Sequence, residues 1–303
     1  MSVDAYVLVM LLLAAGVACA RLQLLPDNAA EVLNKMALNV LLPAAVLRFA
    51  SQLVLDARLL GLIAVPWLLL AASVVLVRWL ARRLAWAPEA RAVLLLCVPL
   101  GNTAFLGYPL IEAMLGKAAL PFAVAYDQFG SFIILSTFGL WVLARYGGDE
   151  KPTFAAMAGR VLRFPAFLAL VAALLLMPDP APPVLARLLE RLSDALLPVV
   201  ALAIGLQLRF RIPAHERTPL AVGLSLKLLV LPALAWALVW AQQLPSPMAE
   251  AAVLESAMAP MISAGALAIS HRLAPGLAAA LVGFGTPLSL LTLWAWRWLL
   301  GVP

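Results

Sequence analysis

The sequence has few charged residues for its length. Of its 303 residues 12% are charged, whereas 65% are hydrophobic. A soluble domain carries about 25% charged residues, so this composition excludes a soluble domain of any size and indicates a polytopic membrane protein. A helical span needs about 20 residues, which leaves room for roughly ten spans joined by short loops.

Cysteine and histidine are scarce as well, with two of each. Cys19 and Cys97 both fall in apolar runs, and two isolated thiols at membrane depth indicate neither a disulfide framework nor a metal site. The sequence holds no cluster with metal-ligand spacing, no phosphate-binding loop, no dinucleotide motif and no recognisable nucleophile–base pair. We therefore expect no metal, no cofactor and no enzymatic activity. The net charge of +6 does not indicate nucleic acid, because the arginines are dispersed between apolar spans.

The apolar runs predict an all-α protein with ten transmembrane spans. We place them at 4–22, 31–52, 58–80, 91–114, 118–146, 154–177, 184–208, 217–241, 248–270 and 276–300. The first run lacks the basic segment of a cleaved signal peptide, so we expect it to be retained. Spans 2 and 7 begin with amphipathic rather than purely apolar sequence.

Loop charges predict the orientation. If the spans alternate, six arginines and lysines fall on the N-terminal side, fourteen on the other side, and Lys227 lies inside span 8, which accounts for all 21. Basic loops stay in the cytoplasm. This bias predicts a multi-pass protein of the cytoplasmic membrane with both termini outside, and with the polar linker 147–153 in the cytoplasm.

The two halves, 1–146 and 154–303, resemble each other. At an offset of 155 residues, Leu41, Leu42, Pro43, Leu47, Gln52 and Leu53 match Leu196, Leu197, Pro198, Leu202, Gln207 and Leu208, and Asn39 falls on Asp194. Pro66 and Pro232, and Pro99 and Pro260, pair at offsets of 166 and 161. Because each half has five spans, the second must enter the membrane in the opposite orientation. This is an inverted repeat, a plan common among secondary transporters.

Span 4 contains the most unusual stretch, C-V-P-L-G-N-T-A-F-L-G-Y-P-L at 97–110. Proline removes a backbone donor and clashes with the preceding turn, so we expect a broken helix at mid-membrane. Freed backbone groups are tolerated there only against protein or a water-filled cavity. The matching break in span 9 is A-P-M-I-S-A-G at 259–265. Paired broken spans in the two halves indicate a transporter's binding site.

The run G-N-T-A-F-L-G-Y-P-L at 101–110 resembles the fourth-span signature of the auxin efflux carrier family. The runs A-M-A-P-M-I-S-A-G-A-L-A at 257–268 and G-T-P-L-S-L-L-T at 285–292, and the L-K-L-L-V-L-P context of Lys227, resemble its bacterial branch. The resemblance implies a fold like that of bile-acid symporters and sodium–proton antiporters, in which broken spans 4 and 9 cross. It further implies a dimeric scaffold of spans 1, 2, 6 and 7, and a mobile transport domain of spans 3–5 and 8–10 that moves like an elevator.

The same resemblance implies transport of organic anions, often carboxylates such as malate or malonate. The plant motif has an additional asparagine where this chain has Val98, which sets the chain apart from the auxin carriers themselves. The long regulatory loop of some plant members is missing between the halves.

The polar residues beside the breaks are the candidate ligands. We expect Asn102 and Thr103, together with Pro99 and Gly101, to line the substrate site, along with Pro260, Met261, Ser263 and Ala264 from the second break. A half-helix N-terminus there would add attraction for an anion. In the alternative interpretation, Asn102 and Thr103 only satisfy the broken backbone, and Ser263 hydrogen-bonds its own helix.

Three charged residues lie at membrane depth, where a charge is costly and functional by default. Asp127 and Glu255 are candidates for ion or proton coupling, with a structural ion pair or a helix cap as the alternative for Asp127. Lys227 either pairs with one of these acids, attracts the anionic substrate or extends to the interface. Asn39 and Asp194 are expected to satisfy backbone groups at kinks, with the substrate path as their second possible role.

The sequence thus predicts a homodimeric secondary transporter for a small organic anion, coupled to protons. One rival is sodium-coupled anion symport. A rival of another class is a non-transporting membrane receptor or scaffold, which fully packed spans 4 and 9 would favour.

Overall fold

A computed structural model of the chain describes residues 3–53, 56–148, 153–178, 181–208, 212 and 216–302. Most of the predicted linker 147–153 lies outside these residues, since 149–152 are not described. The same holds for three basic residues that entered the charge count, Lys151, Arg209 and Arg211.

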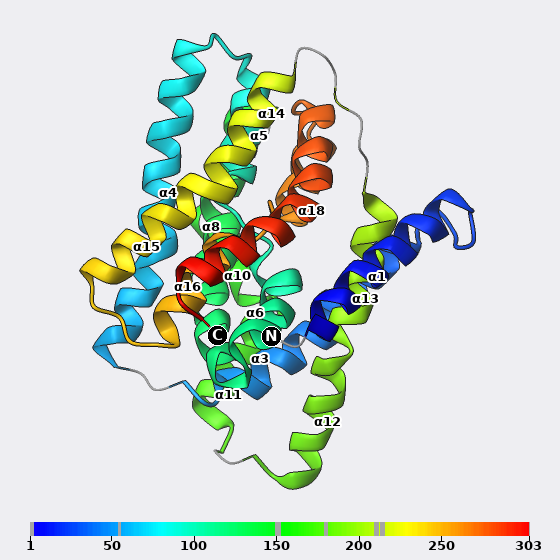
Figure 1. Cartoon of the computed structure of the whole chain (residues 1–303), viewed down its shortest axis with the longest axis vertical. Coiled ribbons are helices and arrows are strands. Elements are labelled where there is room, and N and C mark those ends of the chain that lie inside the picture. Colours follow the sequence, from blue (N-terminus) through cyan, green and yellow to red (C-terminus); the bar gives the residue numbers. More distant parts are fainter. Residues whose placement is uncertain are drawn as a thin grey trace.

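The regular secondary structure of the described residues is helical, with no strand among them, as the composition predicts. Figure 1 shows the helices, which in chain order are α1 (Val3–Arg21), α2 (Ala29–Met36), η1 (Ala37–Leu41), α3 (Leu42–Ala50), α4 (Ala57–Arg83), α5 (Pro88–Cys97), η2 (Thr103–Gly107), α6 (Tyr108–Leu115), η3 (Lys117–Ala119), α7 (Leu120–Tyr126), η4 (Asp127–Ser131), α8 (Phe132–Ile134), η5 (Leu135–Gly139), α9 (Leu140–Gly147), α10 (Phe154–Leu162), α11 (Pro165–Leu176), α12 (Pro183–Asp194), α13 (Leu196–Gln207), α14 (Arg217–Ser225), η7 (Leu226–Val230), α15 (Leu231–Ala241), α16 (Met248–Ser256), α17 (Ile262–Ser270) and α18 (Pro275–Leu299).

Five continuous helices in the described part of the chain are long and apolar enough to cross a membrane. They run over Ala29–Ala50, Ala57–Arg83, Lys117–Gly147, Arg217–Ala241 and Pro275–Leu299, and coincide with predicted spans 2, 3, 5, 8 and 10. The pair α10 and α11 becomes a sixth if its 67° bend is counted within one span. An integral membrane protein is therefore confirmed, and the count of ten spans stays a prediction.

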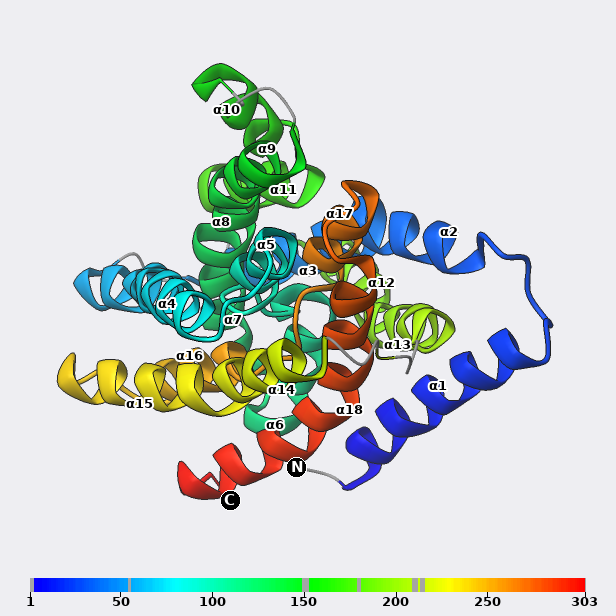
Figure 2. The ribbon, with the colours of Figure 1, turned by 90° about the horizontal axis from the view of Figure 1, so that it is seen from above.

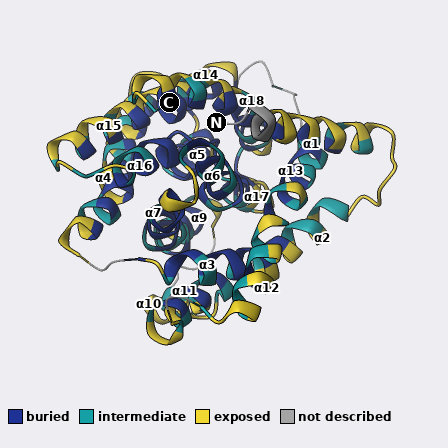
Figure 3. Cartoon of the chain, turned by 60° about the horizontal axis from the view of Figure 1, so that its bottom comes forward, coloured by how far each residue is buried: buried dark blue, intermediate teal, exposed yellow. Residues whose placement is uncertain are grey.

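The helices pack in two groups. In the first, α1 lies along α13 and α11 lies along α3. In the same group, α2 contacts α13, and α12 contacts α3. In the second, α4 contacts α7 and α15, α16 packs on α15 and α7, and α17 packs on α18 and α5. Seen from above, α1, α2, α12 and α13 lie on one side and α4, α15 and α16 on the other (Figure 2). The most deeply buried helices, among them α5, α6 and α7, lie towards the middle, whereas exposed residues are common on α1, α10 and α15 (Figure 3).

Five segments of the helices are wound as wide π-helical turns, namely η1, η2, η4, η5 and η7. Such turns are rare and occur frequently at functional sites. Four of them carry buried polar residues at membrane depth, since η2 begins at Thr103, η4 begins at Asp127, η5 contains Ser136 and η7 contains Lys227. The extra residue in each turn redirects the side chains that follow it, so these turns position the candidate site.

Candidate functional site

The two broken helices contact each other at their breaks. The first break separates α5 from η2, and the second separates α16 from α17. The backbone N–H of Asn102 donates to Ala259 O at 2.8 Å, and that of Met261 donates to Leu100 O at 2.9 Å. These bonds form an antiparallel bridge between Gly101 and Pro260. Each break therefore satisfies backbone groups that the other leaves free, as a low-dielectric environment requires.

Two glycines make the close approach possible. A Cβ on Gly107 would lie 2.5 Å and 2.7 Å from the two carboxylate oxygens of Glu255. A Cβ on Gly101 would lie 3.0 Å from Lys227 Nζ. Any side chain at Gly107 would displace a buried carboxylate, so glycine here sets the spacing between the two broken helices.

The helix termini give the crossing two faces with different electrostatics. The C-terminal ends of α5 and α16 carry partial negative charge, and the N-terminal ends of η2 and α17 carry partial positive charge. Lys227 lies at the C-terminal face, which we call the rear face, and its Nζ donates to Ser256 O at 2.9 Å. An ammonium is the charge that helix C-termini stabilise.

Glu255 is the other charged residue of the rear face. Its side chain is fully buried, at 0% exposure, and neither carboxylate oxygen has a hydrogen-bond partner within the described residues. Lys227 is also buried, and the structure forms no ion pair of 4 Å or less between these two residues within its described part. Burial leaves these charges without water, so the field of Lys227 and that of Asp127 both act on Glu255.

Asp127 lies apart from Lys227 in a hydrogen-bonded cluster of its own. The hydroxyl of Thr103, the phenol of Tyr108 at 2.9 Å and the amide of Gln128 at 2.8 Å all donate to its carboxylate. All four side chains are buried. Thr103 thus binds Asp127 in this structure, and its hydroxyl does not reach the cavity described next.

A cavity of about 730 Å³ adjoins the N-terminal face of the crossing. Four of the predicted site residues line it, namely Asn102, Asp127, Met261 and Ser263. The side chain of Asn102 is 3% exposed, and its Nδ2 has no hydrogen-bond partner within the described residues. The alternative interpretation of Ser263 was that its hydroxyl bonds its own helix. Within the described residues, this hydroxyl makes no such bond. Beside the cavity there are thus a buried amide donor and a serine hydroxyl, neither of which has a partner within the described residues.

The remaining predicted site residues do not line this cavity. Pro99, Gly101, Pro260 and Ala264 form the crossing or the start of α17, Thr103 contacts Asp127, and Lys227 and Glu255 lie at the rear face. The structure thus brings the predicted residues into one region but divides them between a ligand-accessible face and a buried one. Their roles in binding and coupling stay predictions.

Several residues of the site were missed by sequence reasoning. Tyr108 and Gln128 complete the cluster around Asp127, and Arg160, Ser136 and Glu31 line the cavity. Tyr108 stands in the same 101–110 run as Asn102, which was the available signal. Arg160 was treated only as a loop charge, because nothing in the sequence shows that α10 turns back towards the breaks.

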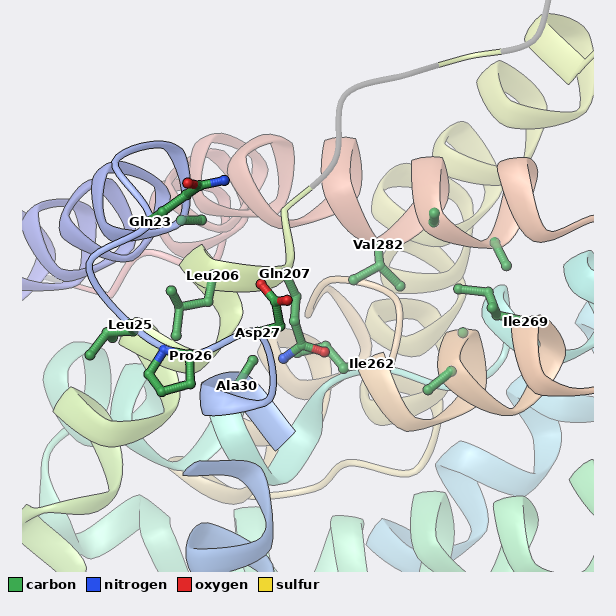
Figure 4. Close-up of a pocket in the computed structure, with 15 residues that line it drawn as sticks. Gln23, Leu25, Pro26, Asp27, Ala30, Leu206, Gln207, Ile262, Ile269 and Val282 are labelled. Carbon is green, nitrogen blue, oxygen red and sulfur yellow. The ribbon is translucent and has the colours of Figure 1, made fainter. Parts of the chain in front are cut away.

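The cavity lies between the two groups of helices. Leu38, Leu42 and Phe164 line it from the group of α3, α11 and α13, whereas Asn102, Ser263 and Leu267 come from the broken helices. A second cavity, of about 370 Å³, lies on the other side of α17, beside the connection from α1 to α2 (Figure 4). Asp27 and Gln207 line it near Ile262, and both cavities contact Ala266 of α17.

An ion cluster joins the two groups elsewhere. Arg48 of α3 contacts Glu190 at 2.6 Å and Asp194 at 3.3 Å, both on α12, and Lys117 of η3 contacts Glu190 at 3.2 Å. Asp194 was expected to satisfy a kink, but its carboxylate accepts from Arg48 instead. Asn39 does bond backbone, since its amide donates to Lys35 O at 2.7 Å.

Comparison with known proteins gives whole-length matches. A family model described as "Membrane transport protein" matches residues 1–297. An uncharacterized transporter of Methanothermobacter thermautotrophicus is 25% identical over 306 residues, which cover 97% of each chain. An uncharacterized transporter of Methanocaldococcus jannaschii is 24% identical over 307 residues, which cover 98% of each chain.

Proposed function

This chain belongs to the membrane transport protein family, which includes the auxin efflux carriers that its 101–110 run resembles, and from that premise we propose that it is a secondary transporter for a small organic anion. The substrate would be a carboxylate of the malate, malonate or auxin-like type. Membership in a transporter family also agrees with the expected lack of enzymatic activity.

The buried amide of Asn102 carries the proposal. A buried donor without a partner costs about 1–3 kcal/mol, so a protein keeps one where a ligand satisfies it. Asn102 stands directly before η2, and Ser263 lies in the first turn of α17, at the partly positive ends of both half-helices. Donors and positive helix ends that converge on one cavity favour an anionic ligand over a cationic one.

The experiment that tests this function is a ligand-stabilisation screen of the purified protein. We would measure the melting temperature against a panel of mono- and dicarboxylates, across pH and sodium concentration. Saturating stabilisation by a carboxylate, reduced in Asn102→Ala, supports the proposal. A panel in which amines or neutral solutes stabilise the protein and carboxylates do not would refute it.

The position of the cavity supports a mechanism of alternating access. Because the cavity lies between two groups of helices, a shift of one group against the other would expose it first to one side of the membrane and then to the other. We infer that α1–α3 and α10–α13 form the scaffold, and that α4–α9 and α14–α18 move as the transport domain in an elevator motion. The link between Lys117 and Glu190 joins these groups and would have to break in each cycle.

We further propose that the scaffold forms a homodimer in the cytoplasmic membrane, with both chain termini outside. Large apolar side chains on α1, such as Leu8 and Leu11, are exposed and would face lipid or a second copy. Cysteine cross-linking in native membranes would detect the dimer, and labelling of added terminal cysteines by an impermeant reagent would report the orientation.

Protons are the proposed coupling ion, with Asp127 as the carrier and Glu255 as the second candidate. Asp127 lines the cavity and is therefore the acid that a solvent proton can reach. Sodium is the alternative, favoured by one observation, which is that the buried carboxylate of Glu255 has no hydrogen-bond partner in the part of the chain that the structure describes. Transport in sodium-free proteoliposomes separates the two. The receptor or scaffold alternative is disfavoured, since the crossing adjoins a cavity of about 730 Å³.

A further inference from the structure

The cavity has three charged residues in its lining, Glu31, Asp127 and Arg160. Two of them have polar partners. Glu31 forms an ion pair with Lys35 at 2.6 Å, and Asp127 accepts hydrogen bonds from three neutral side chains. Arg160 makes no ion pair and no hydrogen bond with any residue that the structure describes. It is therefore the one positive charge among the described residues that line the cavity, and no contact neutralises it.

The backbone around Arg160 is held against the edge of the cavity. Arg160 lies in the last turn of α10, and the chain then bends by 67° into α11. Phe164, at this bend, lines the cavity and stacks on Phe132 with ring centroids 4.2 Å apart. Phe132 belongs to α8, so the stack ties the bend to the helix that follows η4. The backbone of Arg160 is thus fixed by α10 and the bend, while its side chain is exposed.

An uncompensated charge at the edge of a low-dielectric cleft acts beyond contact distance. Such clefts focus the electric field and raise the local concentration of oppositely charged solutes, with effects of about 10- to 1,000-fold on association rates. Arginine also offers a planar fork that binds a carboxylate through two hydrogen bonds. The residue combines both properties at the place where a solute would enter.

We propose that Arg160 is the anion-selecting residue of the cavity, which attracts a carboxylate at the entrance before the ligand reaches Asn102. This rests on the proposed function, since it assumes that the cavity receives an anion. Arg160 sets the charge preference and the rate of entry, and Asn102 makes the deep contact. Lys227 does not share this role, because it is 1% exposed and absent from the cavity lining.

The charge of the cavity can be measured without knowing the substrate. Ser263→Cys places a thiol in the cavity lining, in a chain that also carries Cys19→Ser; the other cysteine, Cys97, is 0% exposed. We would compare the rates at which two methanethiosulfonate reagents of similar size, one with a sulfonate and one with a trimethylammonium group, modify this thiol. The ratio of the two rates reports the electrostatic potential at the cavity.

In the Arg160→Gln variant we expect the ratio of anionic to cationic rate to fall about threefold or more. Arg160→Lys, which keeps the charge, should retain most of the ratio. Arg163→Gln is the matched control, because Arg163 is exposed, lies three residues away and does not line the cavity. Raising the salt concentration should lower the ratio when arginine is present and change it little in Arg160→Gln.

Three results would overturn the proposal. They are an unchanged ratio in Arg160→Gln, an equal fall in Arg163→Gln, and no reaction of either reagent, which would show that the cavity is closed to charged solutes. The reagents are not substrates, so the outcome is independent of transport. A fall in the ratio in a protein that no carboxylate stabilises would show that Arg160 sets the potential of the cavity and would refute the proposed function instead.

Discussion

The two faces of the crossing are built from the same two breaks but differ in what they do with polar groups. At the cavity face, the amide of Asn102 and the hydroxyl of Ser263 have no hydrogen-bond partner among the described residues and lie beside an open volume. At the rear face, Lys227 and Glu255 are buried with no access to that cavity, and Lys227 binds the backbone of Ser256. The difference shows that polarity at membrane depth is not enough to identify a ligand residue. The direction of the helix ends and access to the cavity decide which side binds.

Lys227→Met should have the largest effect and should act on stability. The change leaves Glu255 buried without a positive charge near it and Ser256 O without its donor, which costs about 3 kcal/mol or more. We expect a clear fall in the melting temperature of the purified protein. The double variant Lys227→Met/Glu255→Gln should recover part of the loss, because the buried negative charge is then removed. A stable Lys227→Met protein that no longer binds carboxylates would break the comparison and make Lys227 a ligand.

Asn102→Ala should weaken carboxylate binding and leave stability nearly unchanged, which is the reverse of what we expect for Lys227→Met. Its Nδ2 has no partner within the described residues, so the melting temperature without ligand should change little. A hydrogen bond to a charged ligand contributes about 1.5–3 kcal/mol, so carboxylate binding should weaken about tenfold or more. Thermal-shift titration measures both quantities. Unchanged affinity would remove Asn102 from the site, and a large loss of stability would give it a structural role.

Asp127→Asn tests the residue that contacts both the cavity and the hydrogen-bonded cluster. An amide cannot carry the proton of a carboxylate, so transport in proteoliposomes should lose its dependence on a pH gradient. Thr103→Val is the control, since it removes one donor to Asp127 but keeps the carboxylate. Uptake by Asp127→Asn that follows the gradient as fully as in the parent protein would exclude Asp127 as the proton carrier.

Ser263→Ala should have the smallest effect. A hydrogen bond from this hydroxyl to a carboxylate is also one to a charged group, but a serine hydroxyl can bond its own helix when no ligand is present. This competition lowers the net contribution, so we expect a roughly two- to tenfold loss of affinity. Stability should stay the same, because the hydroxyl makes no hydrogen bond within the described part of the chain. If Ser263→Ala weakens binding more than Asn102→Ala does, the second half of the crossing provides the principal contact, and the asymmetry inferred here is reversed.

Two prolines predicted where regular helices are interrupted, whereas Pro66 and Pro287 lie within the continuous helices α4 and α18. Pro99 and Pro260 both lie in the breaks, and Gly101 pairs with Pro260 where the two breaks meet. A proline reports the loss of a backbone donor, which is a local effect, so local sequence is enough to detect it. The family could be recognised for the same reason, because its signature is one continuous run.

The wide turns and the two faces were not predictable in this way. The turns at Thr103, Asp127 and Lys227 follow from how packed helices distribute strain, and their residues would also fit a regular helix. Arg160 reaches the cavity only because α10 and α11 meet at a 67° bend. The division of Lys227 from Asn102 depends on helix direction around the crossing. Each of these features requires tertiary structure.

The ion cluster on α12 offers positions from which the displacement of the two groups of helices can be measured. Glu190 is shared between Arg48, which belongs to its own group of helices, and Lys117, which belongs to the other. The separation between positions 48 and 190 should therefore stay constant during a transport cycle, while that between 117 and 190 changes with every displacement. Pairs of spectroscopic labels at these positions would measure both distances. The 48–190 distance would serve as the fixed reference, and the distribution of the 117–190 distance would report the displacement of the two groups of helices during transport.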